Sequence, residues 1–266
     1  MKISNQSILM VLWLSIIILT VSVASGSYAA AIEKDTLEVA YLFDGNSADV
    51  VKDISGNDLH GALTGAKRVE GVFGKGLEYD GVDDNVIVTG FKGIGGTEPR
   101  TTVFWFKSDV VREHSWVKWG INSPEQKYYI RSHIRGDACN LRVEVNGGQN
   151  FGMDNVCDGE WHHCAVVFPE GSDAVKDHDL YVDGKLQNKE GTDKAMNTNI
   201  DTQDVNMGAR LANHVFMLGS FDEVAIFNVA LDLNQINAIR KTGLQTALGV
   251  DPQDKLTTRW ATIKKY

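Results

Sequence analysis

The chain has 266 residues, of which 35 are acidic and 26 basic, and its formal net charge is −9. This acidic balance argues against nucleic acid and anionic membrane surfaces as partners. The length left after the N-terminal segment suits one all-β domain with a single core.

The N-terminal segment has the pattern of a secretory signal peptide. Lys2 precedes an apolar run from Ile8 to Val23, and small residues follow it. Ala24 and Ala29 both end a small-x-small cleavage pattern, and we favour the second, which assigns residues 1–29 to the signal peptide. The alternative is an uncleaved membrane anchor, because the run approaches a spanning length. No later segment is apolar enough to span a bilayer, so we expect a secreted or cell-envelope-associated domain without a membrane span in the mature chain.

Short β-rich runs separated by turn signals fill most of the remaining chain. Asp44-Gly45, Gly147-Gly148 and Asp183-Gly184 are examples of these turns. Many short strands without intervening helices predict a two-sheet antiparallel jelly-roll sandwich rather than a parallel α/β sheet. The expected strands include residues 37–43, 85–88, 101–106, 117–119, 128–132, 205–207 and 221–227.

Two of the three cysteines are positioned to form a disulfide. Apolar residues alternate with polar ones over 141–145, and the turn at Gly148 then predicts a hairpin. Cys139 and Cys157 lie equally far from that turn, so they face each other across the two strands. Cys164 is left as a free thiol in an apolar run, where it is expected to be buried.

The string Trp161-His162-His163-Cys164 looks at first like a metal or catalytic site. Adjacent histidines on a strand point to opposite faces, so His162 and His163 cannot chelate one ion together. We therefore interpret this string as the start of a core strand that follows the Asp158-Gly159 turn.

The last third of the chain holds one hairpin and one helix. Asp183-Gly184 between apolar residues predicts a two-residue hairpin loop within 180–186. Asp232 and Gln235 have the spacing of a capping box, and an apolar stripe follows them up to Gly243, which predicts a short helix packed on the sandwich. Residues 248–266 are expected to form an exposed tail.

Taken in order, a set of motifs gives the chain a family resemblance. They are Tyr41-Leu42-Phe43-Asp44-Gly45, then 53–61 (DISGNDLHG), 74–84 (GKGLEYDGVDD), 158–163 (DGEWHH), 180–186 (LYVDGKL) and 219–228 (GSFDEVAIFN). This ordered set resembles the laminin-G-like jelly-roll domains of the concanavalin A-like lectin/glucanase superfamily. The resemblance assigns residues 30–247 to one such domain.

The resemblance also implies a structural calcium ion, because related jelly rolls often carry one that ties the first strand to the last. The implied metal ligands are Asp44, Asn57, His60 and Asp222. Calcium takes six to eight oxygen ligands, which suits carboxylates and loop carbonyls. Asp83 and Asp84 form a second acidic candidate, although Asp residues in such a turn commonly accept hydrogen bonds from its amides.

Catalysis is not expected. Glycosidases of the superfamily need two carboxylates that converge on one bond, and the Glu-x-Asp-x-x-Glu string that would supply them is missing. Asp222 and Glu223 are the nearest acidic pair, but they are adjacent, so they are expected to face opposite sides of the sheet and not to converge on one bond. A divergent glycoside hydrolase is therefore the last of three hypotheses.

The favoured function is lectin-like binding of an extracellular glycan or a glycosylated surface. Sugar sites combine exposed aromatic rings with polar groups, and aromatic and basic residues gather between Ser115 and Arg135. The predicted ligand-binding residues are Trp116, Trp119, Tyr129 and Arg131, with Trp116 and Tyr129 expected to be exposed. The competing hypothesis is an adhesion module that contacts protein without sugar specificity.

Overall fold

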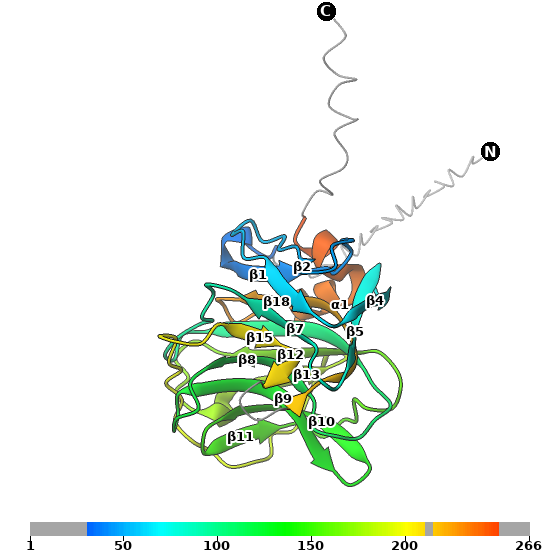
Figure 1. Cartoon of the computed structure of the whole chain (residues 1–266). Coiled ribbons are helices and arrows are strands. Elements are labelled where there is room, and N and C mark those ends of the chain that lie inside the picture. Colours follow the sequence, from blue (N-terminus) through cyan, green and yellow to red (C-terminus); the bar gives the residue numbers. More distant parts are fainter. Residues whose placement is uncertain (1–30, 211–214, 250–266) are drawn as a thin grey trace, which may run out of the picture.

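The computed structural model describes residues 31–210 and 215–249 (Figure 1). The predicted signal peptide and most of the predicted tail lie outside the described residues. The described chain consists mainly of short strands, with 3-10 turns at Lys34–Thr36 and Val175–Asp177 and one α-helix, α1 (Leu233–Ala247).

Most of the described strands form two antiparallel sheets, as the sequence predicts, and each of these sheets has eight strands. In sheet A the order is β14-β13-β12-β7-β18-β5-β4, with β1 also paired to β18; in sheet B it is β11-β10-β9-β8-β15-β6-β3-β2. Sheet A contains β1 (Leu37–Tyr41), β4 (Lys67–Glu70), β5 (Lys75–Asp80), β7 (Arg100–Lys107), β12 (His162–Phe168), β13 (Asp179–Val182), β14 (Lys185–Leu186) and β18 (Leu218–Phe227). Sheet B contains β2 (Val50–Val51), β3 (Gly61–Thr64), β6 (Asn85–Val88), β8 (Ser115–Gly120), β9 (Lys127–Arg135), β10 (Ala138–Val145), β11 (Gly148–Phe151) and β15 (Val205–Met207), while β16 (Ala209–Arg210) pairs only with β17 (Val215–Phe216).

The main core lies between the two sheets. Side chains on alternate positions of each strand enter it, because a strand points successive residues to opposite faces. Phe104 packs against Trp116 of sheet B and Phe221 of its own sheet, with ring centroids 5.4 and 5.0 Å apart. All three rings are fully buried, so they contribute strongly to the hydrophobic stabilisation of the sandwich.

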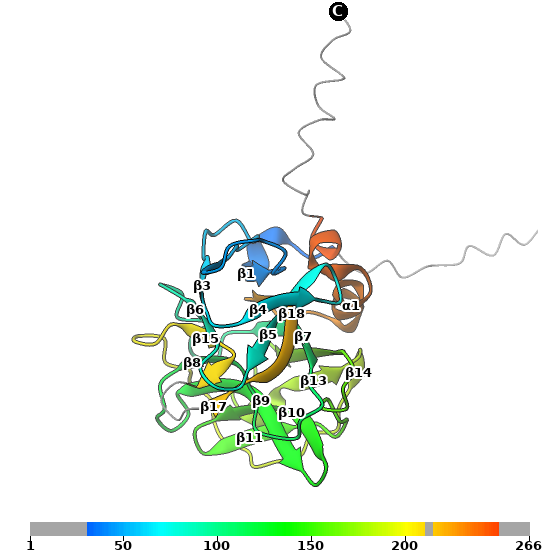
Figure 2. The same ribbon diagram turned by 45° about the vertical axis from the view of Figure 1, so that its right-hand side comes forward.

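Helix α1 covers the outer face of sheet A and forms a second core there (Figure 2). Ile236 and Ile239 are buried together with Val103 and Ala225 of the sheet. The predicted capping box is confirmed, because Asp232 accepts from the Gln235 backbone N–H and Gln235 accepts from that of Asp232. The helical segment continues beyond the predicted end at Gly243, where a positive φ of 79° breaks the helix before a final turn.

The first and last strands run side by side in sheet A. Leu37 pairs with Phe227 and Tyr41 pairs with Val224. Main-chain hydrogen bonds therefore join the first and last strands of the domain, which the family resemblance implied to be neighbours.

The Trp161–Cys164 string begins strand β12, as predicted. His163 is fully buried on the outer face, 5.2 Å from the Trp105 ring by centroid distance, and burial lowers its pKa to about 3. His162 instead links two turns: Nδ1 lies 2.8 Å from Asp183 and Nε2 lies 3.0 Å from Asp158. Asp183 and Gly184 both have positive φ, as expected of the predicted hairpin turn.

We expect His162→Gln to destabilise the protein at neutral and acidic pH. The hydrogen bond with Asp183, and then that with Asp158, raise the pKa of His162 from 6.5 to about 9. Because the pKa is raised in the folded state, protonated His162 stabilises the fold fully below pH 6.5, and this stabilisation disappears as the pH rises through about 9. Urea titration at pH 6 should show a loss of about 1–2 kcal/mol, reduced by solvent screening of the two carboxylates.

The exposed His60 provides the matched control, and His60→Gln should leave stability unchanged. At pH 10 the His162 variant should approach the parent protein. An equal loss at both pH values would mean that packing alone, and not the charged bridge, is responsible.

Candidate functional site

Two acidic residues that are far apart in the sequence meet at the end of the β1–β18 pair. Asp222 Oδ2 accepts from the backbone N–H groups of Val72 and Phe73, and Asp44 Oδ1 accepts from that of Lys75. Both carboxylates therefore hold the turn between β4 and β5. The close approach depends on glycine, since a Cβ at Gly71 or Gly74 would collide with one of the carboxylates.

Glu223 joins this acidic group because β18 has a bulge. Asp222 pairs with Trp105 and Ala225 with Val103, so Glu223 and Val224 together face a single residue of β7. Glu223 has a φ of 46°, and its carboxylate accepts from the backbone N–H of Leu244 in α1. The expectation that the two adjacent acids face opposite sides is thus wrong, because the extra residue interrupts the alternation.

The environment of these carboxylates opposes their ionisation. Burial, with a smaller contribution from the negative charge of Asp44, raises the pKa of Asp222 to about 7. Burial, followed by the charges of Asp222 and Asp44, raises the pKa of Glu223 to about 8. Asp222 is fully buried and Glu223 nearly so. Carboxylates gathered in this way favour a cation, which would compensate their charge.

The structure brings Asp44 and Asp222 together but not the whole predicted ligand set. Asn57 donates to the carbonyl oxygens of Leu37 and Glu38, at the start of β1, whereas Asp44 follows the end of that strand. His60 is exposed and makes no hydrogen bond to either acid within the described part of the chain. A cation here would therefore need backbone oxygens besides the two carboxylates.

The predicted aromatic ligand-binding residues divide into two groups. Trp116 and Trp119 are fully buried in the core, so the expected exposure of Trp116 is wrong. A register shift between Ser115 and Val117 turns Trp116 inward. Tyr129 and Arg131 do lie on the opposite face of sheet B, but Tyr129 is fully covered there and not exposed as expected.

A cavity that no sequence motif marks opens at one end of sheet A. Its volume is about 490 Å³, and it lies where β5 and β7 end and β18 begins. Its lining combines carboxylates (Glu78, Asp80, Asp84, Asp109), amines (Lys67, Lys107), hydroxyls (Ser108, Ser220) and the apolar Val110 and Leu218. Sequence reasoning missed it because these residues come from distant segments and share no pattern.

The acidic turn that contains Asp83 and Asp84 lies beside this cavity, and its aspartates accept hydrogen bonds from turn amides as the sequence analysis considered. Asp84 Oδ2 accepts from the backbone N–H of Asp80, and Asp80 Oδ1 accepts from that of Val82. Asp80, Asp83 and Asp84 do bring one ligand atom each within 4.8 Å of one another. Their hydrogen bonds to backbone amides show that two of the three brace the turn.

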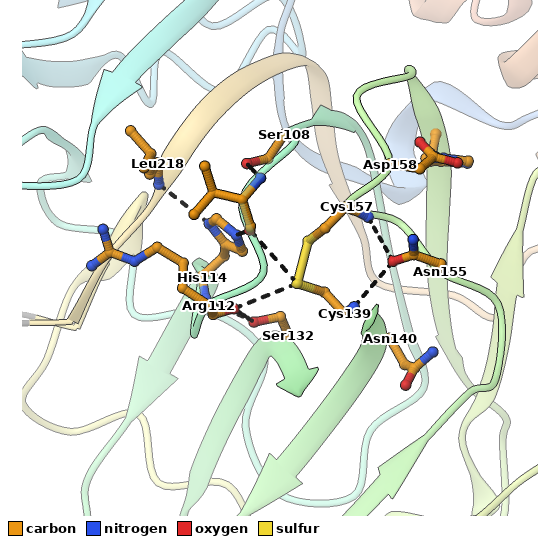
Figure 3. Close-up of a disulfide and its surroundings, with 12 residues drawn as sticks. Ser108, Arg112, His114, Ser132, Cys139, Asn140, Asn155, Cys157, Asp158 and Leu218 are labelled. Carbon is orange, nitrogen blue, oxygen red and sulfur yellow. Dashed lines mark hydrogen bonds and ion pairs between the residues drawn. A yellow bond between two sulfur atoms is a disulfide. The ribbon is translucent and has the colours of Figure 1, made fainter. Parts of the chain in front are cut away.

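The predicted disulfide between Cys139 and Cys157 is present (Figure 3), and it lies beside the segment that carries the lining residue Val110. Asn155 accepts from the backbone N–H of both cysteines, and the Cys139 sulfur lies 3.8 Å from the Val110 carbonyl oxygen. The disulfide therefore fixes the segment that carries Val110.

A neutral histidine connects two lining segments of the cavity. His114 Nε2 donates to the Val110 carbonyl, and Nδ1 accepts from the Leu218 backbone N–H (Figure 3). Burial lowers the pKa of His114 to about 4, so the neutral form that this arrangement requires is present at neutral pH. The cavity is thus built on strand ends and cross-linked segments rather than on free loops.

Comparisons with known proteins agree with this architecture. A family model described as the concanavalin A-like lectin/glucanases superfamily matches residues 80–237. None of the curated proteins compared with the chain matches it significantly. No helix among the described residues is both long and apolar enough to cross a membrane.

Several solved structures share the fold. Domain 4 of AbnA, a GH43 extracellular arabinanase from Geobacillus stearothermophilus solved with arabinotriose, has a TM-score of 0.56 at 20% identity, covering 76% of this chain and 96% of that one. The binding domain of Paraclostridial Mosquitocidal Protein 1 has a TM-score of 0.54 at 18% identity, covering 77% and 52%. Trypanosoma rangeli sialidase has a TM-score of 0.54 at 13% identity, covering 79% and 33%, so the chain spans about a third of it.

Removal of the disulfide should loosen the domain measurably. The double variant Cys139→Ala/Cys157→Ala opens a cross-link between residues 18 positions apart. We expect it to lower the free energy of unfolding by about 2–4 kcal/mol, measured by chemical denaturation. A reducing agent should give the parent protein a similar loss and leave the variant unchanged. An unaltered melting temperature after reduction would contradict the supporting role of this bond.

Proposed function

We propose that this chain, which belongs to the concanavalin A-like lectin/glucanases superfamily, is a secreted, non-catalytic carbohydrate-binding module whose sugar site is the cavity beside Leu218 and Ser220. The observation that carries the proposal is the mixed lining of that cavity. Its volume of about 490 Å³ falls in the range of small-ligand sites.

The chemistry of the lining suits a hydroxyl-rich ligand. Each sugar hydroxyl both donates and accepts a hydrogen bond, and the cavity offers acceptors on Glu78 and Asp109, donors on Lys107, and the hydroxyl of Ser220. Leu218 adds an apolar surface for the carbon-bound faces of a sugar ring. These groups stand on strand ends and braced turns, which limits the entropy lost on binding.

The state of the other acids supports binding without catalysis. Asp222 and Glu223 are buried and already accept backbone N–H groups, so they do not face a substrate. Asp80 and Asp84 line the cavity, and each likewise holds a turn amide. Hydrolysis by a carboxylate pair would require both members to be available to the glycosidic bond, and of the four acids that line the cavity only Glu78 and Asp109 could form such a pair.

A structural calcium ion is part of the proposal. Asp44 and Asp222 would hold it, and neighbouring backbone carbonyl oxygens would complete its shell. The raised pKa values of Asp222 and Glu223, to which the negative charge of Asp44 contributes, support this assignment, because a divalent cation would offset the repulsion among these acids. Its contribution would be to fasten the β4–β5 turn to β18 and not to take part in chemistry.

The sugar site is tested by filling the cavity. We expect the mature chain to bind at least one neutral oligosaccharide on a glycan array, and Ser220→Trp to weaken that binding about tenfold or more, because the indole occupies the space of the sugar. Affinity would be measured by calorimetry on the glycan that the array identifies.

Ser172→Trp is the matched control, since Ser172 stands in a turn that does not line the cavity. If both variants weaken glycan binding equally, or if Ser220→Trp does not weaken it, the cavity is not the sugar site. Silence across the array together with capture of a glycan-free protein would favour the adhesion hypothesis. Release of reducing sugar from any oligosaccharide would restore the glycoside hydrolase hypothesis.

The metal is tested by thermal stability. Calcium at a hundred times its dissociation constant should stabilise the native state by about 2.7 kcal/mol and raise the melting temperature accordingly. Asp44→Asn should abolish this increment, since the amide keeps an acceptor for the Lys75 N–H but loses the charge. Asp137→Asn, at an exposed hairpin turn, should retain it. A melting temperature that ignores both calcium and chelator would rule out the ion.

A further inference from the structure

A compact group of basic side chains lies on the outer face of sheet B, away from the core. We call it the Tyr129 cluster; it comprises Tyr129 with Lys118, Lys127, Arg131, Arg142 and Arg210. Strand register explains why they meet. Lys118 pairs with Tyr129 and Arg142 pairs with Arg131, so these side chains share one face while Tyr128 and Ile130 point into the core.

The cluster has an excess of positive charge. Glu144 contacts Lys127, Arg131 and Arg142, and Glu113 lies 2.7 Å from Arg131. Five cations and two carboxylates leave a local charge of +3, in a chain whose formal net charge is −9. The local charge of the Tyr129 cluster is therefore opposite in sign to the net charge of the chain.

Two of the five cations have no carboxylate partner among the described residues. Lys118 donates to the side-chain oxygen of Gln203 at 2.7 Å, and the Arg210 guanidinium lies 5.5 Å from the centre of the Tyr129 ring. Burial, then the charges of Arg210 and Lys127, lower the pKa of Lys118 to about 8. An added negative charge would relieve this repulsion.

Polar atoms on the same face also lack partners. Arg142 Nε and Asn206 Oδ1 are buried and have no hydrogen-bond partner among the described residues. The hydroxyls of Tyr129 and Ser115 are also fully buried, and they interact with each other. Buried polar atoms without partners cost free energy, so such a group on one face indicates a missing ligand or ordered solvent.

We propose that the Tyr129 cluster binds the carboxylate or sulfate group of an acidic saccharide. Guanidinium groups pair with such planar or tetrahedral anions through two parallel hydrogen bonds, and Arg142 Nε, which has no partner among the described residues, supplies a further donor. The Arg131 and Arg142 side chains remain partly exposed, at 13% and 16%, so an anion can reach them. The site is separate from the Ser220 cavity, and its saccharide ligand class rests on the proposed function.

The inference is tested with matched oligosaccharides and a charge-removing variant. The probes are a polygalacturonate tetrasaccharide, a sulfated chondroitin tetrasaccharide and a neutral arabinose tetrasaccharide. We expect at least one acidic probe to bind the mature chain, and Lys118→Gln/Arg210→Gln to weaken it about tenfold or more by calorimetry. These two changes leave no carboxylate without its partner, so the fold should persist.

The control variant, Lys67→Gln/Lys107→Gln, removes the same charge from the Ser220 cavity. If it abolishes acidic binding and the Lys118/Arg210 variant does not, the inference fails while the proposed function stands. The inference also fails, and the proposed function stands, if the chain binds only the neutral probe and Ser220→Trp abolishes that binding. Equal affinity for a short DNA duplex would also overturn it, because it would show a general response to polyanions. The preferred acidic probe identifies carboxylate or sulfate as the recognised group.

Discussion

The domain depends on one irregularity in its last strand, the bulge that places Asp222 and Glu223 on the same side of β18. Asp222 holds the β4–β5 turn, and Glu223 holds the end of helix α1. Strand β18 itself pairs with β1, β5 and β7. The bulge thus fastens the chain ends, the outer turn and the helix to one central strand. Its cost is two buried carboxylates with raised pKa values, which makes this the point where a cation would contribute most.

The two proposed binding surfaces differ because they occupy different parts of the sandwich. The cavity lies at strand ends, where turns rise above sheet A and can surround a ligand. The Tyr129 cluster lies on the face of sheet B, where neighbouring strands place side chains at fixed separations but build no walls. A cavity selects by shape and hydrogen bonding, whereas a flat charged face selects by charge. Neither surface uses the residues that stabilise the β1–β18 junction.

Features governed by local pattern were predictable from the sequence. The Asp183-Gly184 hairpin, the Asp232 cap and the Cys139–Cys157 bond each follow from residues within one short segment. Features that depend on register were not. Bulges at Trp116 and at Glu223 interrupt the alternation of strand residues, so a simple count assigns the wrong face to Trp116 and to one of the two adjacent acids. The cavity was equally hidden, because five separate segments assemble it.

Overall charge and local charge act at different distances in this protein. At physiological ionic strength, charges beyond about 8 Å are largely screened, so a long polyanion approaching the acidic chain experiences mainly repulsion from whichever acids it passes. A single anionic group that reaches Arg131 and Arg142 lies within that distance of the cations and experiences mainly their local field. The net charge of −9 therefore disfavours long polyanions, but it does not prevent a short anion from binding at the Tyr129 cluster. An acidic exterior around a small basic site favours short acidic ligands over extended ones, which is a form of selectivity that needs no further contacts.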